Sequence, residues 1–256
     1  MQGLLKLLDI PRATVGQSPV WDDMTGLLWW VDVRGPYFYC TDPRCGRTEA
    51  WALPELVGSL TRCRSGTLLL ALRSRVVCFD PRDATLGTVA APEADRPHNR
   101  LNDGKASPFG RFVVGGMDDR PEKHPTAALW CVHPGGTVTQ LVEGMTVSNG
   151  LAWNPDGRTL WYSDSRRTSI WTAPWDQSTG TIGAARLVAA PDDATGRPDG
   201  AAMDAEGGYW SAGVSAGVLN RWRPDGTLDR VVRLPVSAPT MPCFGGTGVP
   251  VGCVAD

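Results

Sequence analysis

The amino-acid sequence predicts an all-β fold of the propeller type, and three observations support this prediction. Glycine (30 residues) and proline (21 residues) are abundant, and the 11 tryptophans lie among Val, Leu and Thr, as is typical of strands joined by tight turns. A short pattern recurs five times: an apolar pair leads into a polar turn that contains glycine, and a second strand follows. The turn glycines are 40, 44, 47 and 50 residues apart, which is the length of a four-stranded propeller blade.

Each repeat predicts a hairpin, and the five hairpins follow one another along the chain. They are VWDDMTGLLWWVDV from Val20, LTRCRSGTLLLAL from Leu60, ASPFGRFVVGG from Ala106, LAWNPDGRTLWYSDS from Leu151 and AAMDAEGGYWSAG from Ala201. In each, an inner strand enters the turn and a second strand leaves it. Apolar runs that follow, such as 76–79 and 129–132, supply outer strands. A helical fold is excluded because glycine and proline leave few stretches long enough for the helical period.

The overall charge and the cysteines exclude several kinds of function. A formal net charge of −2 gives no reason to expect nucleic acid or a membrane surface as a partner, whereas small neutral or weakly anionic ligands remain open. The first residues lack the features of a secretory leader and no apolar run reaches membrane-spanning length, so a cytoplasmic protein is expected. The 7 cysteines form no C-x-x-C pair, which favours reduced thiols over a disulfide framework or a zinc knuckle.

The turn glycines also align a set of polar residues on the inner strands. Asn102, Asn149 and Asp199 each lie eight residues before the turn glycine of their repeat, and Gln17 lies nine before its own. The second repeat has Gly58 at this position and offers no side chain. If the repeats are blades related by rotation about one axis, equivalent positions form a ring. The four side chains are therefore expected to converge at one mouth of the central channel.

Carboxamide and carboxylate oxygens are hard donors, so this ring predicts a site for one divalent cation: Ca²⁺, Mg²⁺ or Mn²⁺, with zinc or iron as further possibilities. The alternative interpretation is that each residue only begins a turn before a strand, which is a common local use of Asn and Asp. The alignment of the whole set favours the cation site.

Longer stretches around these residues resemble the gluconolactonase, regucalcin and senescence marker protein family of six-bladed β-propellers. The matching pieces are GQSPVWDDMTGLLWWVDV, NRLNDGKASPFGRFVVGGM, VSNGLAWNPDGRTLWYSDS, RPDGAAMDAEGGYWSA and MPCFGG. The resemblance implies a divalent cation held at Gln17, Asn149 and Asp199. It also implies that Arg100 and Asn102 bind substrate, and that the protein is a sugar-lactone hydrolase or a calcium-binding relative.

Two features depart from the pattern of that family. Gln17 stands where the family has glutamate, and losing one ligand carboxylate weakens cation binding by on the order of several kcal/mol before desolvation offsets it. The piece at 243–246 resembles the entry to a sixth blade, but only ten residues follow it. Residues 1–256 are therefore expected to form a single β-propeller domain with an incomplete sixth blade, which leaves the segment around Leu4 to Leu8 without a partner strand.

The chemistry implied is attack of water on a lactone carbonyl, with the cation as Lewis acid and Asp199 as general base and ligand. Asp118 and Glu122, in the loop after the third repeat, could reach substrate hydroxyls, but an ordinary charged loop is the favoured interpretation. One alternative is a noncatalytic propeller that binds a metal or a metabolite or serves as a scaffold. Another is a paraoxonase-like esterase, against which the polar Arg100 and Asn102 argue. The sequence leaves open which lactone and which metal are used and whether the protein is a monomer or a dimer.

Overall fold

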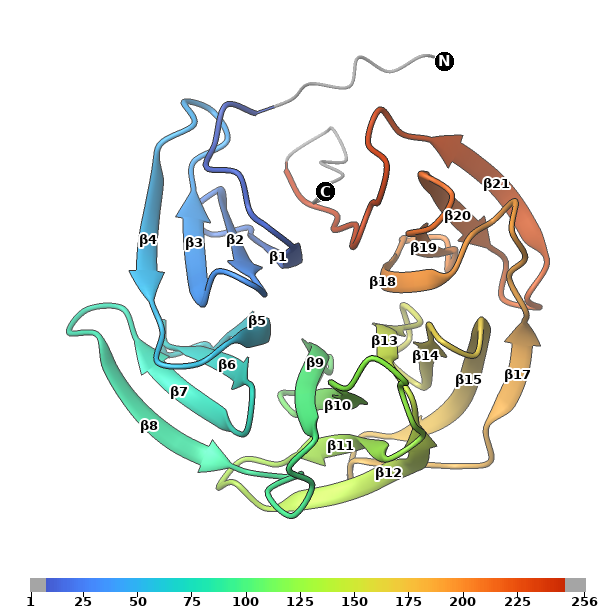
Figure 1. Ribbon diagram of the computed structural model, residues 1–256, viewed down its shortest axis with the longest axis horizontal. Coiled ribbons are helices and arrows are strands. Elements are labelled where there is room, and N and C mark those ends of the chain that lie inside the picture. The colour runs from blue at the N-terminus through green and yellow to red at the C-terminus, as the bar shows by residue number, and fades with distance from the viewer. Residues whose placement is uncertain (1–7, 247–256) are drawn as a thin grey trace.

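The computed structural model describes residues 8–246, which form five antiparallel sheets arranged as blades around a central axis (Figure 1). The first, second, third and fifth blades have four strands each, and the fourth has five because β16 and β17 both pair with β15. The prediction of an all-β propeller is confirmed. Across the described residues no helix is long and apolar enough to cross a membrane.

The strands follow one another from the axis outward within each blade. The first blade comprises β1 (Gly16–Asp22), β2 (Leu27–Asp32), β3 (Tyr37–Thr41) and β4 (Thr48–Ala52). The second comprises β5 (Val57–Arg62), β6 (Leu68–Leu72), β7 (Val76–Asp80) and β8 (Thr85–Ala90). The third comprises β9 (Asn99–Ala106), β10 (Phe112–Asp118), β11 (Ala127–Val132) and β12 (Val138–Met145). The fourth comprises β13 (Ser148–Trp153), β14 (Thr159–Asp164), β15 (Ser169–Asp176), β16 (Thr181–Ile182) and β17 (Arg186–Ala189). The fifth comprises β18 (Pro198–Met203), β19 (Tyr209–Gly213), β20 (Val218–Trp222) and β21 (Leu228–Arg233).

The hydrophobic core lies between neighbouring blades. Trp29 and Phe38 of the first blade pack in one cluster with Leu60 and Leu70 of the second, and the fourth and fifth blades share a cluster that includes the stacked rings of Trp161 and Tyr209. The inner strands are buried along most of their length, whereas outer strands such as β21 are largely exposed. Burial of apolar faces between blades therefore holds the inner strands at fixed positions around the channel.

A sixth blade is not confirmed, because residues 8–246 form five. The chain after β21 contains no strand within the described residues; it runs back toward the axis between β18 and β1 (Figure 1). Three prolines at 235, 239 and 242 remove backbone donors from this stretch, which disfavours a strand there. Thr240 joins the two flanking blades: its carbonyl accepts from the Gly200 N–H (2.8 Å) and its hydroxyl donates to the Gly16 carbonyl (2.6 Å).

The same segment also packs by its side chains on both neighbours. Cys243 lies in a cluster with Leu28 and Trp30 of the first blade, and Phe244 meets Trp210 of the fifth edge to face. Residues 240–245 thus occupy the space between the first and fifth blades. The predicted tail of the sixth blade at 247–256 and most of the segment around Leu4 lie outside the described residues.

Candidate functional site

A β-bulge marks the ring position in every inner strand. The pairing with the second strand of the blade shifts register between Gln17 and Val20 in β1, between Asn149 and Ala152 in β13, and between Pro198 and Ala201 in β18. The second and third blades have corresponding shifts. A bulge bends its strand and redirects the adjacent side chains. The repeated bulges therefore aim the ring residues toward the channel mouth.

The first turn explains why Gln17 lies nine residues before its glycine and not eight. In that turn the Gly26 N–H donates to the carbonyl of Asp22, four residues earlier, whereas in the fourth blade the Gly157 N–H donates to Asn154, three residues earlier. The first turn thus contains one extra residue. Counted from the start of the turn, Gln17 and Asn149 occupy the same position.

Gln17 and Asp199 meet across the first and fifth blades. The Gln17 amide nitrogen lies 3.4 Å from Oδ1 and 3.5 Å from Oδ2 of Asp199, so the contact is a long hydrogen bond. The backbone after Gln17 is unusual, because Ser18 has a φ of 52°, and its hydroxyl accepts from the Leu60 N–H and donates to the Leu60 carbonyl. These bonds offset the strain of a left-handed residue beside the site.

Asn102 and Asn149 meet across the third and fourth blades. The Asn102 amide donates to Asn149 Oδ1 (3.2 Å) and to the Ser148 carbonyl (2.9 Å). Arg100, buried in the same strand as Asn102, donates through Nη1 to Asn102 Oδ1 (2.9 Å). The predicted substrate residues therefore lie against the predicted cation ligand Asn149.

A serine that the sequence analysis missed connects the two halves of the site. Ser165 accepts a hydrogen bond from the Asn149 amide (2.8 Å), and its hydroxyl donates to the carbonyl of Pro198, directly before Asp199. Asn149 Oδ1 therefore faces Asn102 while its amide nitrogen is fixed on Ser165. In sequence, Ser165 is distinguished only by its place at the end of YSDS, which recurs in no other repeat.

The charges in the channel raise the proton affinity of Asp199. Burial, followed by repulsion from the carboxylate of Asp103, raises the pKa of Asp199 to about 7. Burial also raises the pKa of Asp103, against the attraction of Lys105, and Asp103 Oδ1 is a buried atom with no hydrogen-bond partner among residues 8–246. Lys105 reaches across the channel, where its Nζ donates to the Ala201 carbonyl (2.6 Å).

The second blade has no ring side chain for a steric reason. A Cβ on Gly58 would lie 2.5 Å from the carbonyl oxygen of Asn102 and 2.7 Å from that of Leu101. Glycine therefore allows β5 to approach β9 closely, and this approach supports the strand that carries Arg100 and Asn102.

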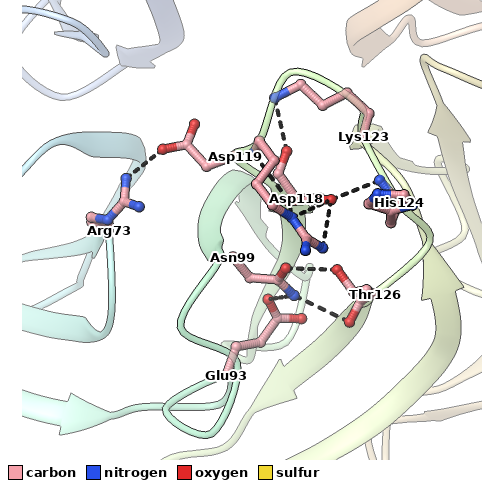
Figure 2. Close-up of polar contacts among 9 residues, drawn as sticks. Arg73, Glu93, Asn99, Asp118, Asp119, Lys123, His124 and Thr126 are labelled. Atoms are coloured by element: carbon pink, nitrogen blue, oxygen red, sulfur yellow. Dashed lines mark hydrogen bonds and ion pairs between the residues drawn. The ribbon is translucent and has the colours of Figure 1, made fainter.

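The loop between β10 and β11 borders the same mouth (Figure 2). Asp118 is fully buried at its base, where the carboxylate accepts from the Arg120 guanidinium (2.9 Å) and from the His124 N–H (2.7 Å). The bond from Arg120 is the main reason why the pKa of Asp118 is lowered. Asp118 thus anchors the loop, and Glu122 lies exposed in it. Both positions agree with the ordinary charged loop that the sequence analysis favours.

Asp119 is a second residue that the sequence analysis missed. Its Oδ1 lies 3.4 Å from the Arg100 Nε, and its Oδ2 bonds Arg73 of the second blade (Figure 2). Burial alone would raise the pKa of Asp119, but the bond from Arg73 and the charge of Arg100 outweigh it and lower the pKa. Asp119 therefore ties Arg100 to the neighbouring blade.

The residues at the mouth offer oxygen donors of the kind that a divalent cation prefers. Asp199 makes no ion pair among the described residues, so its buried carboxylate has a charge to be compensated. Asn149 Oδ1 has a second lone pair, and rotation of the Gln17 amide would turn its oxygen toward Asp199 in place of its nitrogen. The donor set would then consist of one carboxylate, from Asp199, and two amide oxygens, from Asn149 and Gln17. Among residues 8–246 no group of three or more His, Cys, Asp or Glu is placed to hold a metal ion.

Fold and site together define a class: a β-propeller whose inner strands gather amide and carboxylate side chains at one mouth of the channel. Comparison with protein families agrees, since residues 15–250 match the SMP-30/Gluconolactonase/LRE-like region. The chain belongs to this family.

Individual relatives cover most of the chain. Regucalcin from Xenopus laevis is 32% identical over 237 residues, which are 91% of this chain and 79% of the relative. The 6-deoxy-6-sulfogluconolactonase of Pseudomonas putida is 32% identical over 247 residues, which are 96% of this chain and 84% of the relative. The crystal structure of a calcium-binding regucalcin from Agrobacterium tumefaciens superimposes with a TM-score of 0.87 at 27% identity, covering 92% of this chain and 80% of that one.

Proposed function

We propose that this protein hydrolyses a sugar lactone with the help of one divalent cation held by Gln17, Asn149 and Asp199. The observation that carries the proposal is the position of the buried Asp199 carboxylate at the channel mouth, in contact with Gln17 and next to Pro198, whose carbonyl is linked to Asn149 through Ser165. The family includes lactonases and calcium-binding proteins, and both properties fit this arrangement.

In the proposed reaction Asp199 removes a proton from the attacking water. A general base needs a carboxylate free of its proton, and the pKa of about 7 in the cation-free protein falls when a bound cation favours the charged form. The chemistry that a bound divalent cation supplies is polarisation of the lactone carbonyl and activation of water. Asp199 serves as ligand and base because its two oxygens can face the cation and the water separately.

Arg100 and Asn102 would orient the sugar. The buried Arg100 guanidinium is fixed by Asp119 and by Asn102 Oδ1, so its remaining N–H groups are held in a fixed direction. Burial, against the attraction of Asp119, lowers the pKa of Arg100 to about 10, and the group remains a cation at neutral pH. A fixed donor fork beside an amide suits the hydroxyl and ring oxygens of a polyol.

Gln17 would make the cation site weaker than one with two carboxylates. A neutral amide supplies one oxygen without the charge, and its nitrogen already contacts Asp199 in this structure. This contact favours the second candidate function, a noncatalytic propeller that binds a cation or a metabolite. In that case Asp199 is a ligand only.

The test measures opening of glucono-1,5-lactone by proton release, on the wild type, Gln17→Glu and Asp199→Asn, each after chelation and after addition of Ca²⁺, Zn²⁺, Mn²⁺ or Mg²⁺. We expect low turnover that a cation stimulates, an increase in the glutamate variant, and loss of at least about 100-fold in the asparagine variant. Cation binding by calorimetry accompanies each assay. Binding without turnover in both the wild type and Gln17→Glu would support the noncatalytic function, and no response of either protein to any cation would refute the proposal.

A further inference from the structure

Cationic side chains from three blades surround the mouth of the channel. Arg73 follows β6 in the second blade, Arg100 lies in β9, and Lys123 lies in the loop after β10, where its Nζ donates to the Asp118 carbonyl (2.8 Å) (Figure 2). Arg34 follows β2 in the first blade and acts electrostatically on both Arg100 and Lys123, which places it at the same mouth. These loops all lie at the end of the blades where the ring residues begin the inner strands.

The carboxylates nearby do not balance these cations. Asp119 is shared between Arg73 and Arg100, and Asp118 is engaged by Arg120. Asp32, close to Arg34 in sequence, is buried; it accepts the Arg34 N–H and the N–H groups of the segment that enters β1.

Two of the cations have room for a partner. Arg34 is exposed and its guanidinium makes no ion pair within residues 8–246. Lys123 is only partly buried; burial and the charges of Arg100 and Arg34 lower its pKa, against the attraction of Asp119. The neighbouring Glu122 is exposed and interacts with Arg120. An excess of positive charge at a channel mouth attracts anions and raises their local concentration.

We propose that the substrate carries an anionic oxygen group, such as a phosphate, sulfonate or carboxylate, which binds to Arg34, Arg73 and Lys123 while the lactone ring faces Asp199. The inference deepens the proposed lactonase function and rests on it. Arginines on fixed loops suit such groups because they donate two parallel hydrogen bonds. The anionic group is remote from the reacting carbonyl, so it should improve binding more than turnover.

The test compares glucono-1,5-lactone with 6-phosphoglucono-1,5-lactone and the carboxylate-bearing glucaro-1,4-lactone. The variant is Arg34→Gln/Lys123→Gln, which leaves the Arg73–Asp119–Arg100 contacts intact, and the matched control is Arg64→Gln/Arg158→Gln, which removes the same charge from exposed turns at the opposite end of the blades. Thermal unfolding checks that each variant folds, and Lys123→Arg preserves the charge if Lys123→Gln does not fold.

We expect the KM for at least one anionic lactone to rise by about tenfold or more in the mouth variant, with kcat and the neutral lactone changed by less than about twofold. The control should leave all three substrates unchanged, and higher ionic strength should weaken only the anionic ones. Equal effects on the neutral and anionic lactones, or a preference of the wild type for the neutral one, would overturn the proposal. If no lactone is hydrolysed, only the lactonase function fails. Calorimetry with 6-phosphogluconate then tests the anion site alone. Binding by the wild type that is lost in the mouth variant would support the site, and no binding by the wild type would overturn it.

Discussion

Replacing Asp199 by asparagine should change how the stability of the cation-free protein depends on pH. The folded-state pKa of Asp199 is about 7, above the unfolded value of 3.8. The folded state therefore binds the proton more tightly than the unfolded state. This contribution to the free energy of unfolding is present below the unfolded pKa and is lost as the pH rises through the folded pKa. An asparagine side chain has no such proton to lose, so the variant should lack this part of the pH dependence.

The magnitude follows from the size of the shift. Three pKa units correspond to about 4 kcal/mol in total, of which about 3 kcal/mol falls between roughly pH 5 and pH 8. A bound cation opposes the effect, because it compensates the carboxylate in the folded state. At the higher pH, added cation should stabilise the wild type and have little effect on the variant.

The assay is urea unfolding followed by tryptophan fluorescence, with chelator, near pH 5 and near pH 8. The wild type and Asp199→Asn are compared so that titrating groups that do not interact with Asp199 cancel, and the difference reports Asp199 together with its coupled neighbour Asp103. Asp156→Asn, in the exposed turn before β14, is the matched control. If wild type and Asp199→Asn lose the same free energy between the two pH values, the reasoning about the buried carboxylate is wrong.

Three further substitutions test how the site is held. Gly58→Ala should destabilise the protein by about 2 kcal/mol and raise the KM for substrate, since the new methyl group would displace the backbone of Asn102; urea unfolding and kinetics measure this. Lys105→Met should cost about 2 kcal/mol in unfolding experiments, because the hydrogen bond to β18 is lost, and should tighten cation binding by calorimetry, because a positive charge beside Asp103 is removed. Thr240→Val should cost about 1 kcal/mol, seen as a lower Tm, because it removes the bond to the Gly16 carbonyl; an unchanged Tm would show that this bond does not join the blades.

The fold was largely predictable because its repeat is local. Each turn glycine follows an inner strand and precedes a second strand, so spacing along the chain reports spacing around the axis. The number of blades was less predictable. The residues 240–245 contain a motif that resembles the entry to a blade, but the structure there depends on packing against Trp21, Leu28 and Trp210 from distant strands.

Some residues of the candidate site could likewise be predicted from the sequence and others could not. Gln17, Asn102, Asn149 and Asp199 could be aligned from sequence because the bulge recurs at one position in every blade. Lys105 had no such signal, since its partner lies 96 residues away and the contact depends on how a long side chain crosses the channel. Loops and strand ends whose sequences are not repeated supply Asp119, Ser165 and the cations at the mouth (Arg34, Arg73 and Lys123). Only the arrangement of the blades around the axis brings these residues together.

The side chain at position 17 affects the binding of both the cation and the anionic substrate. A glutamate there would add negative charge beside Asp199, which strengthens attraction for a divalent cation and opposes binding of an anionic substrate at the same mouth. Gln17→Glu should therefore lower the Kd for the cation and, measured at saturating cation, raise the KM for the phosphorylated lactone relative to the neutral one. Without cation, two adjacent carboxylates should lower the Tm near pH 8, and this loss should vanish near pH 5 as Asp199 takes up a proton. If the variant binds the cation more tightly but the ratio of the two KM values does not move, Gln17 affects the cation alone, and the charge at the mouth is set by Arg34, Arg73 and Lys123.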